Sequence, residues 1–262
     1  MDIHKPKAWH SAREFLKEYT IIVVGVLTAL AFEQGVETLR WAEKVERGQA
    51  HAASELTVLY YMAVERSSVE ACLNRRLTML SDALLSGEGR WTPLTPAMGN
   101  AATIGDVAYI APTRPWSEES WKTLIADGTA NHLSDKMMLR YARLYTQVAQ
   151  VRGHNEAETA ASQRLGLLRA ETVLSRAERN QLVVQVEELR LLNRRMALSG
   201  RQLMGQIARI VTIDPVKARA FYEANSNAHR SCTAMGFESP PLVEAPAAGG
   251  AGGPAGPRRA GG

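Results

Sequence analysis

The sequence predicts an all-α protein in which an N-terminal transmembrane helix continues into a long helix and packs with further helices as an antiparallel helical bundle. Three observations predict this class. Apolar residues recur at helical spacing along most of the chain. Helix-capping residues precede these stretches and glycines follow them. One uncharged apolar run lies near the N-terminus, and 45% hydrophobic residues supply enough apolar surface for a core.

We expect four segments along the 262 residues. They are an N-terminal cytoplasmic tail over 1–14, a transmembrane anchor with its exit over 15–40, an extracytoplasmic helical bundle over 41–237, and a disordered Gly/Pro/Ala-rich tail over 238–262.

The anchor is predicted from the run over residues 19–32, which carries no charge and would rise about 21 Å as a helix. Adding Phe15 and Leu16, with the ammonium group of Lys17 reaching towards water, extends the apolar body to about 27 Å. A bilayer core measures about 30 Å. Charged residues then follow on one helical stripe: Glu33, Glu37, Arg40 and Lys44. This pattern favours a single transmembrane helix.

Two alternatives to an anchor remain. The letters ALAF at residues 29–32 fit the small-x-small pattern of a signal peptidase site, which would place cleavage near Ala31. Acidic residues in the leading segment, and the lack of a helix breaker after the run, disfavour cleavage. Apolar runs of this length are also found as buried core helices. The stretch from Ile21 to Leu27 is apolar on all sides, which disfavours a helix on the surface of a small bundle.

Basic residues on both sides of the run give only a slight bias in orientation. The short basic tail ahead of a large C-terminal part favours a cytoplasmic N-terminus. We therefore expect a single-pass protein of the bacterial inner membrane whose bulk lies in the periplasm.

A long helix is predicted to continue from the anchor up to Ser86, because no Pro or Gly interrupts residues 50–86. Arg66 and Glu70 interrupt its apolar seam, where they could set the register of a coiled coil or face solvent. Pro and Gly residues then predict an irregular crossing loop over 87–115.

Each later helix has a start signal and two have a clear stop. The start signals are Ser117 after Pro115, Ser134, the capping box of Ser175 and Glu178, and Asp214 with Pro215; the stops are Gly128 and Gly236.

The letters REFLKEYTIIVVGVLTALAFEQGVETLRW, from Arg13 to Trp41, resemble the N-terminal signature of single-pass bacterial membrane proteins of domain-of-unknown-function families. The second stretch SWKTLIADGTANHLSDKMMLRYARLYTQV, from Ser120 to Val148, is similar to their next common block. The resemblance covers about a third of the chain. It implies an anchored helical protein and supplies no activity.

No motif for catalysis, cofactor binding or metal binding is evident, so we expect no enzymatic activity and no cofactor. The six histidines are scattered, and no nucleophile elbow or phosphate loop occurs. His154 and Glu158 share a helical face, for which a solvated surface is the favoured interpretation. Acidic and basic residues alternate along helical faces, which disfavours a nucleic-acid partner.

Cys72 and Cys232 are disulfide candidates. Two buried thiols are expected in a cytosolic protein, whereas an oxidising periplasm favours a bridge. A bridge between residues 160 apart would contribute roughly 4–5 kcal/mol in the chain-entropy model.

Small residues in the apolar run form two small-xxx-small pairs, Gly25 with Ala29 and Ala31 with Gly35. They are candidates for helix packing within the membrane and hence for a homo-oligomer. Such pairs also arise by chance in spans rich in Ala and Gly.

Three functions are compatible with this sequence. A non-enzymatic interaction or scaffolding module of the bacterial envelope, with the lipid bilayer and another envelope protein as partners, is favoured. The first alternative is a ligand-sensing extracytoplasmic domain that acts through a partner, with Trp116, Trp121, Tyr141 and Tyr145 as candidates to line a pocket. The second is an exported soluble helical protein, released by cleavage near Ala31.

Overall fold

The computed structural model describes residues 12–94, 108–225, 227–238 and 240–243. Most of the predicted N-terminal tail, and the predicted C-terminal tail beyond residue 243, lie outside these described residues. In chain order the elements are α1 (Ala12–Ser68), α2 (Glu70–Ser86), β1 (Arg90–Trp91), α3 (Glu119–Ala126), the 3₁₀ helix η2 (Thr129–His132), α4 (Asp135–Gln163), the 3₁₀ helix η3 (Arg164–Arg169), β2 (Thr172–Val173), α5 (Arg176–Ile207), α6 (Pro215–Asn225) and α7 (Asn227–Ala234). The all-α class is confirmed.

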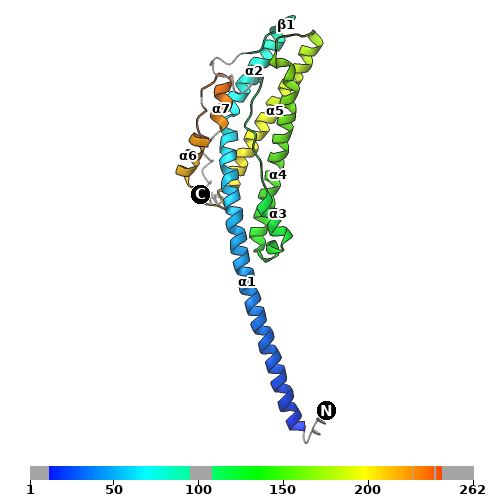
Figure 1. Cartoon of the computed structure of the whole chain (residues 1–262), viewed down its shortest axis with the longest axis vertical. Coiled ribbons are helices and arrows are strands. Elements are labelled where there is room, and N and C mark those ends of the chain that lie inside the picture. Colours follow the sequence, from blue (N-terminus) through cyan, green and yellow to red (C-terminus); the bar gives the residue numbers. More distant parts are fainter. Residues whose placement is uncertain (1–11, 95–107, 226, 239, 244–262) are drawn as a thin grey trace, which may run out of the picture.

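Helix α1 has two halves with different surroundings (Figure 1). Its N-terminal half projects alone from the rest of the molecule, and its C-terminal half is covered by other elements. Buried positions begin at Ala52 and recur down to Ser68. We call residues 41–94 and 108–243, as far as they are described, the helical body.

The single helix predicted up to Ser86 is wrong in one respect, because α1 ends at Ser68 and α2 begins at Glu70. Helical hydrogen bonding passes through the junction, with a long 3.4 Å contact from the Val69 amide to the Glu65 carbonyl. The Ser68 hydroxyl also donates to the Val64 carbonyl at 2.9 Å. In Figure 1, α2 continues in a different direction from α1, so the chain is kinked at a junction without a Pro or Gly.

Helix α5 is the central element of the helical body, since it packs against α1, α2 and α4. The predicted capping box at its start is confirmed, with reciprocal bonds between Ser175 and Glu178. Its Gly200 permits a close approach to α1: a Cβ atom at this position would lie 2.9 Å from the Ser67 hydroxyl and 3.2 Å from the Ala63 carbonyl oxygen.

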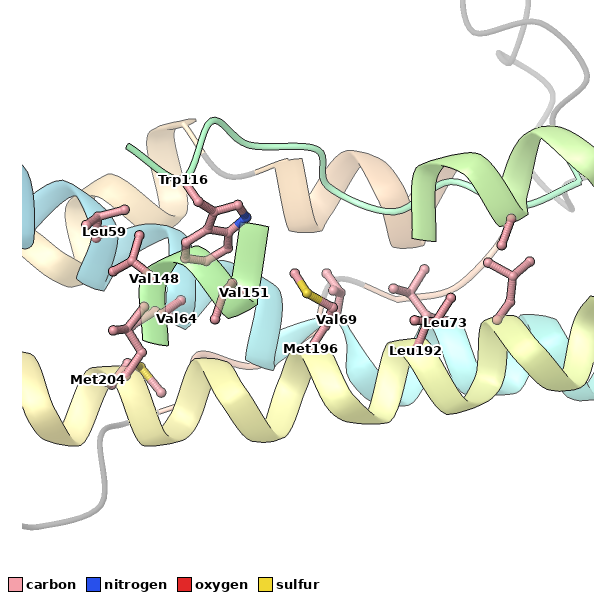
Figure 2. Close-up of a cluster of buried hydrophobic side chains, with 14 of the residues drawn as sticks. Leu59, Val64, Val69, Leu73, Trp116, Val148, Val151, Leu192, Met196 and Met204 are labelled. Carbon is pink, nitrogen blue, oxygen red and sulfur yellow. The ribbon is translucent and has the colours of Figure 1, made fainter. Parts of the chain in front are cut away.

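Aliphatic and aromatic side chains from α1, α2, α4 and α5 meet in one core (Figure 2). Leu56, Leu73, Val148 and Met196 are completely buried. Burying such side chains contributes about 1.5–3 kcal/mol each relative to exposure. Trp116, from the segment ahead of α3, is buried among them.

The predicted irregular loop over 87–115 contains more order than expected. β1 pairs antiparallel with β2 through Arg90–Val173 and Trp91–Thr172. Residues 108–118 have little regular structure but contribute to the core, and Tyr109 is only 3% exposed. Two-residue strands show no recognisable periodicity, so their pairing could not be predicted.

The C-terminal helices α6 and α7 lie beside α1. The Asp214 carboxylate accepts from the amides of Val216 and Lys217, which confirms the predicted start at Asp214 and Pro215. Gly236 follows α7 with a φ of 83°, in agreement with the predicted stop.

Candidate functional site

The apolar run predicted as an anchor is exposed at every position except Val23, which is partly exposed. Ile21, Ile22 and Leu27 are each at least 60% accessible. Among the described residues, α1 is the helix that is long and apolar enough to cross a membrane, and none of its most apolar window is buried. The interpretation of this run as a core helix of the helical body therefore does not hold.

The four small residues predicted as helix-packing candidates, Gly25, Ala29, Ala31 and Gly35, are all exposed. Gly25 and Gly35 have open space where a Cβ atom would be. These surfaces are accessible to a second helix, and the helix-packing role itself stays a prediction.

The turn between α3 and α4 contacts α1 at the point where α1 leaves the helical body. The indole ring of Trp41 stacks on the imidazole ring of His132 with 3.8 Å between centroids. The Lys44 ammonium donates to the Asp127 carbonyl at 2.9 Å and lies 3.3 Å from its carboxylate. Gly128 has a φ of 78° between these residues, as expected for the predicted helix stop. The turn between α3 and α4 is thus fixed to α1 at the end of the helical body that is nearest the apolar run.

A cluster of charged and polar side chains is buried beside the kink between α1 and α2. The Arg66 guanidinium lies 2.6 Å from the Glu158 carboxylate and donates to the Asn193 side-chain oxygen at 2.9 Å. The Tyr109 hydroxyl donates to the same Glu158 oxygen at 2.6 Å. Asn193 in turn donates to the Glu70 carbonyl and to the Asn74 side chain.

This cluster corrects two sequence interpretations. Glu158 is 2% exposed, so it belongs to the interior and not to a solvated helix face. Arg66 is 1% exposed and joins α1 to α4 and α5. A buried charge needs a partner, and Arg66 and Glu158 each supply the partner of the other. Glu70, by contrast, is partly exposed and pairs with Arg201 at 2.7 Å.

A second buried carboxylate holds the segment over 108–118. Glu65 is completely buried and accepts from Arg114 through both oxygens, at 2.7 and 2.9 Å. This two-pronged geometry is the strongest form of a guanidinium–carboxylate contact. The segment is therefore fastened to α1 by Arg114 and to α4 by Tyr109.

The pKa of the Tyr109 hydroxyl is raised well above its ordinary value by burial and then by the negative charge of Glu158. Tyr109 is consequently a neutral hydrogen-bond donor in the folded protein. The contacts of this cluster join α1, α4, α5 and the segment over 108–118.

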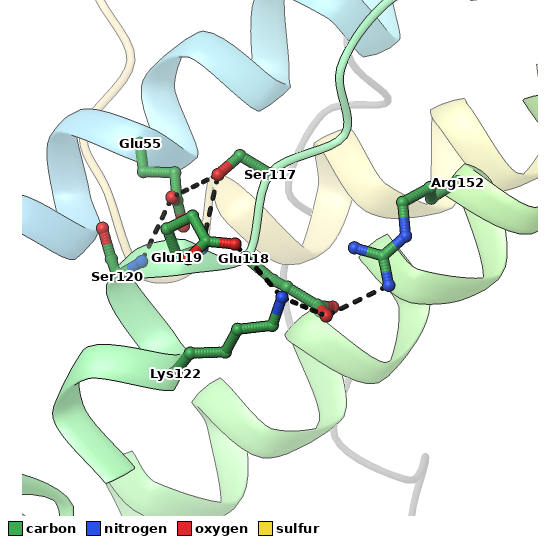
Figure 3. A network of polar contacts seen from close by, with 7 residues as sticks. All are labelled: Glu55, Ser117, Glu118, Glu119, Ser120, Lys122 and Arg152. Carbon is green, nitrogen blue, oxygen red and sulfur yellow. Dashed lines mark hydrogen bonds and ion pairs between the residues drawn. The ribbon is translucent and has the colours of Figure 1, made fainter. Parts of the chain in front are cut away.

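The start of α3 is held by side chains from two other helices (Figure 3). The Glu55 carboxylate of α1 accepts from the Ser117 hydroxyl at 2.9 Å and the Ser120 amide at 3.2 Å. Glu118 pairs with Arg152 of α4 at 3.0 Å. The prediction that Ser117 caps this helix is thus only partly right, because α3 begins at Glu119 and Glu55 accepts from its first turn.

Cys72 and Cys232, the two residues predicted as a pair, are joined by a disulfide with 5.8 Å between their Cα atoms. The bridge fastens α7 to α2. Nearby, the guanidinium of Arg75 lies 5.3 Å from the ring centre of Phe237.

The aromatic residues considered for a ligand pocket pack on one another. The rings of Trp121 and Tyr145 stack at 5.9 Å, and Tyr141 lies 6.3 Å from Tyr145. Tyr141, Tyr145 and Trp116 are each 2% exposed, so packing of the core accounts for them. Among the described residues, no group of three or more His, Cys, Asp or Glu side chains is arranged to hold a metal ion.

The chain has no match. Comparisons with protein-family models, with curated proteins and with solved structures all find nothing similar. The resemblance to single-pass membrane families therefore stays a prediction.

Proposed function

We propose that this protein is a single-pass, membrane-anchored helical bundle of the bacterial envelope that serves as a non-enzymatic interaction or scaffolding module. The observation that carries the proposal is the exposure of the apolar half of α1. A soluble protein rarely leaves an apolar surface of this extent in water, and the run makes no packing contact with the helical body that would cover it. A bilayer would cover it completely.

The continuity of α1 supports an uncleaved anchor. The helix passes without interruption through the ALAF letters at 29–32 and on to Ser68. A signal sequence would show the same exposed apolar run, so release near Ala31 is the alternative that the experiment has to separate.

An exposed stripe on α5 supports the interaction role. Val184, Leu191 and Leu198 are each at least half exposed and recur every seven residues on one face. Glu187 and Glu188 flank one half of this stripe, and Arg194 and Arg195 flank the other. Its partner would be an amphipathic helix with the same heptad spacing and the opposite order of charges.

Fractionation combined with protease protection and N-terminal sequencing tests the anchor. We expect the full chain in the membrane fraction, with its original N-terminus, and with the helical body cleaved only when protease reaches the periplasm. Recovery in the soluble periplasmic fraction with a new N-terminus near Phe32 would establish the exported alternative. Protection of the helical body in intact spheroplasts would reverse the orientation.

Site-specific photo-crosslinking tests the stripe. A photoreactive residue at Leu191 should give a discrete crosslinked species in cells, and the same residue at exposed Thr146 on α4 should give none. The species should disappear when Glu187 and Glu188 are both changed to Arg. Equal crosslinking from Leu191 and Thr146 would contradict a specific interface.

A pocket of about 360 Å³ between α1 and α6 favours ligand sensing as the second candidate. Its lining is mainly apolar: Tyr60, Val64, Pro215, Val216, Ala218, Arg219, Leu242 and Val243. It would suit a small apolar molecule, and Val64→Trp should fill it. Thermal stabilisation of the wild type, but not of Val64→Trp, by a medium-chain hydrocarbon would support this function.

A further inference from the structure

The turn between α3 and α4 contacts α1 at Trp41. Its distance from the hydrocarbon core of the membrane follows from the position of the apolar run. Trp41 is nine residues beyond Phe32, which is about 14 Å along the helix. The apolar body from residue 15 to 32 is about 27 Å long, so it fills a hydrocarbon core of about 30 Å and places Phe32 near its boundary.

The headgroup layer occupies about half of the distance from Phe32 to Trp41. A bilayer of about 40–45 Å with a core of about 30 Å leaves about 5–8 Å of headgroups on each side. The turn therefore begins about 6–9 Å beyond the headgroups for an upright helix. That gap is short enough for side chains and one or two layers of water to span.

The turn presents polar side chains at this end. Asn131 and His132 of η2 and Lys136 of α4 are exposed, and in Figure 1 this end of the helical body faces the apolar half of α1. A groove of about 690 Å³ runs between α1 and His132, and Gln34, Glu37 and Trp41 are among its lining residues. Glu37 is only about 8 Å beyond Phe32 along the helix, within the depth of the headgroups.

The charges at this height are mixed. On α1, Glu33 and Glu37 are followed by Arg40 and Lys44, and Asp135 precedes Lys136 at the start of α4. A surface that selects anionic lipids is a cluster of Lys and Arg. Alternating charges suit headgroups that carry both an ammonium and a phosphate group.

We propose that exposed side chains of the turn over residues 128–136 reach zwitterionic phospholipid headgroups, directly or through one or two layers of water, so that the helical body stands close to the membrane surface. This inference rests on the proposed anchor, because the height is measured from the apolar run.

The test places one fluorophore at a time on the full chain in vesicles of zwitterionic phospholipid, with the native disulfide intact. The three sites are exposed: Ile22→Cys in the apolar run, Asn131→Cys in the turn, and Ala170→Cys on the opposite end of the helical body. A quencher attached to the lipid headgroup should quench the fluorophore at Asn131 several-fold more than the one at Ala170. A quencher on the acyl chain should quench the fluorophore at Ile22.

Two controls separate the possible failures. Inserting seven helix-forming residues after Phe32 lifts the turn by about 10 Å with little rotation, and should abolish quenching at Asn131 while quenching at Ile22 persists. Raising the salt, or adding anionic lipid, should change quenching at Asn131 little, because the surface is not polybasic.

Each contrary result has a distinct meaning. Quenching at Asn131 as weak as at Ala170, with Ile22 still quenched from the acyl chain, would overturn the headgroup contact and leave the anchor intact. The lack of quenching at Ile22 would overturn the anchor itself. Quenching at Asn131 that requires anionic lipid would overturn the assignment to zwitterionic headgroups.

Discussion

Arg66 and Glu158 form an ion pair 2.6 Å apart in the interior of the protein, where both side chains are at most 3% accessible. The pair ties the last turn of α1 to the C-terminal part of α4, directly beside the kink at Val69. The Glu158 carboxylate also accepts from the hydroxyl of Tyr109, so two segments distant in sequence converge on the carboxylate of a third.

Removing one member of this pair should destabilise the protein strongly. Glu158→Ala leaves Arg66 charged and buried without its counter-ion, and we expect a loss of about 3–5 kcal/mol. Glu156→Ala, at an exposed position of the same helix, should cost less than about 0.5 kcal/mol. Denaturant unfolding of the full chain in detergent, followed by circular dichroism, measures both. Equal effects would contradict a structural role for the pair.

Replacing both charges tests whether the charged pair itself stabilises the protein. The alternative is that an apolar pair serves as well, and that only the loss of one partner is destabilising. The double variant Arg66→Met with Glu158→Leu should recover most of the loss, since apolar pairs often substitute for buried ion pairs. A double variant as unstable as Glu158→Ala would show that Tyr109 and Asn193 depend on the charges.

Because α5 approaches α1 closely at Gly200, we predict that alanine substitutions at Gly200 and Gly205 of α5 have different effects on stability. Gly200→Ala places a methyl group 2.9 Å from the Ser67 hydroxyl and 3.2 Å from a backbone oxygen, and should cost about 1–3 kcal/mol. Gly205→Ala meets nothing within 4 Å, and should be neutral or stabilising by up to about 1 kcal/mol. The two melting temperatures should therefore move apart. A loss of stability in Gly205→Ala as large as that in Gly200→Ala would refute the close-contact explanation.

We predict that the disulfide stabilises the protein by holding α7 to α2. Reduction, or Cys72→Ser, should lower the free energy of unfolding by roughly 4–5 kcal/mol in the chain-entropy model, and should expose α6 and α7 to limited proteolysis first. Non-reducing electrophoresis should show a mobility shift of the wild type that the variant lacks. Identical mobility with and without reductant would mean that the cysteines are not bridged in the cell.

We predict that the stability of the protein depends on pH through His154. Burial, and then the positive charge of Arg195, lowers its pKa below the ordinary value of 6.5. The unfolded chain therefore binds this proton more readily, so the contribution of His154 to stability is present above pH 6.5 and is lost as the pH falls below it. Comparing unfolding midpoints at about pH 8 and pH 5.5 should show a smaller drop in His154→Gln than in the wild type. The same drop in both proteins would assign the effect to other groups.

The sequence allowed the elements to be predicted well wherever a local rule decides them. Ser175 with Glu178, Asp214 with Pro215, and the glycines at 128 and 236 mark helix ends through contacts within a few residues. The kink at Val69 was missed, because the junction has no breaker residue of its own.

The buried cluster was missed for a related reason. Arg66 was recognised as a break in an apolar seam and Glu158 was assigned to a solvated face, because pairing them requires knowledge of which helices meet. Their shared signal is a charge at a position where the heptad spacing calls for an apolar residue. Two such charges of opposite sign on different helices would have been sufficient grounds to propose the contact.

The unbroken course of α1 has a mechanical consequence. A helix shorter or longer than the local hydrocarbon thickness adjusts by tilting or by deforming the lipid. From Phe32 to Ser68 the helix extends about 54 Å, so a change in tilt of about 10° would move its far end sideways by about 9 Å. No Pro interrupts this length to absorb the motion. In the proposed anchored protein, the lateral reach of the helical body over the membrane would thus vary with the thickness of the bilayer.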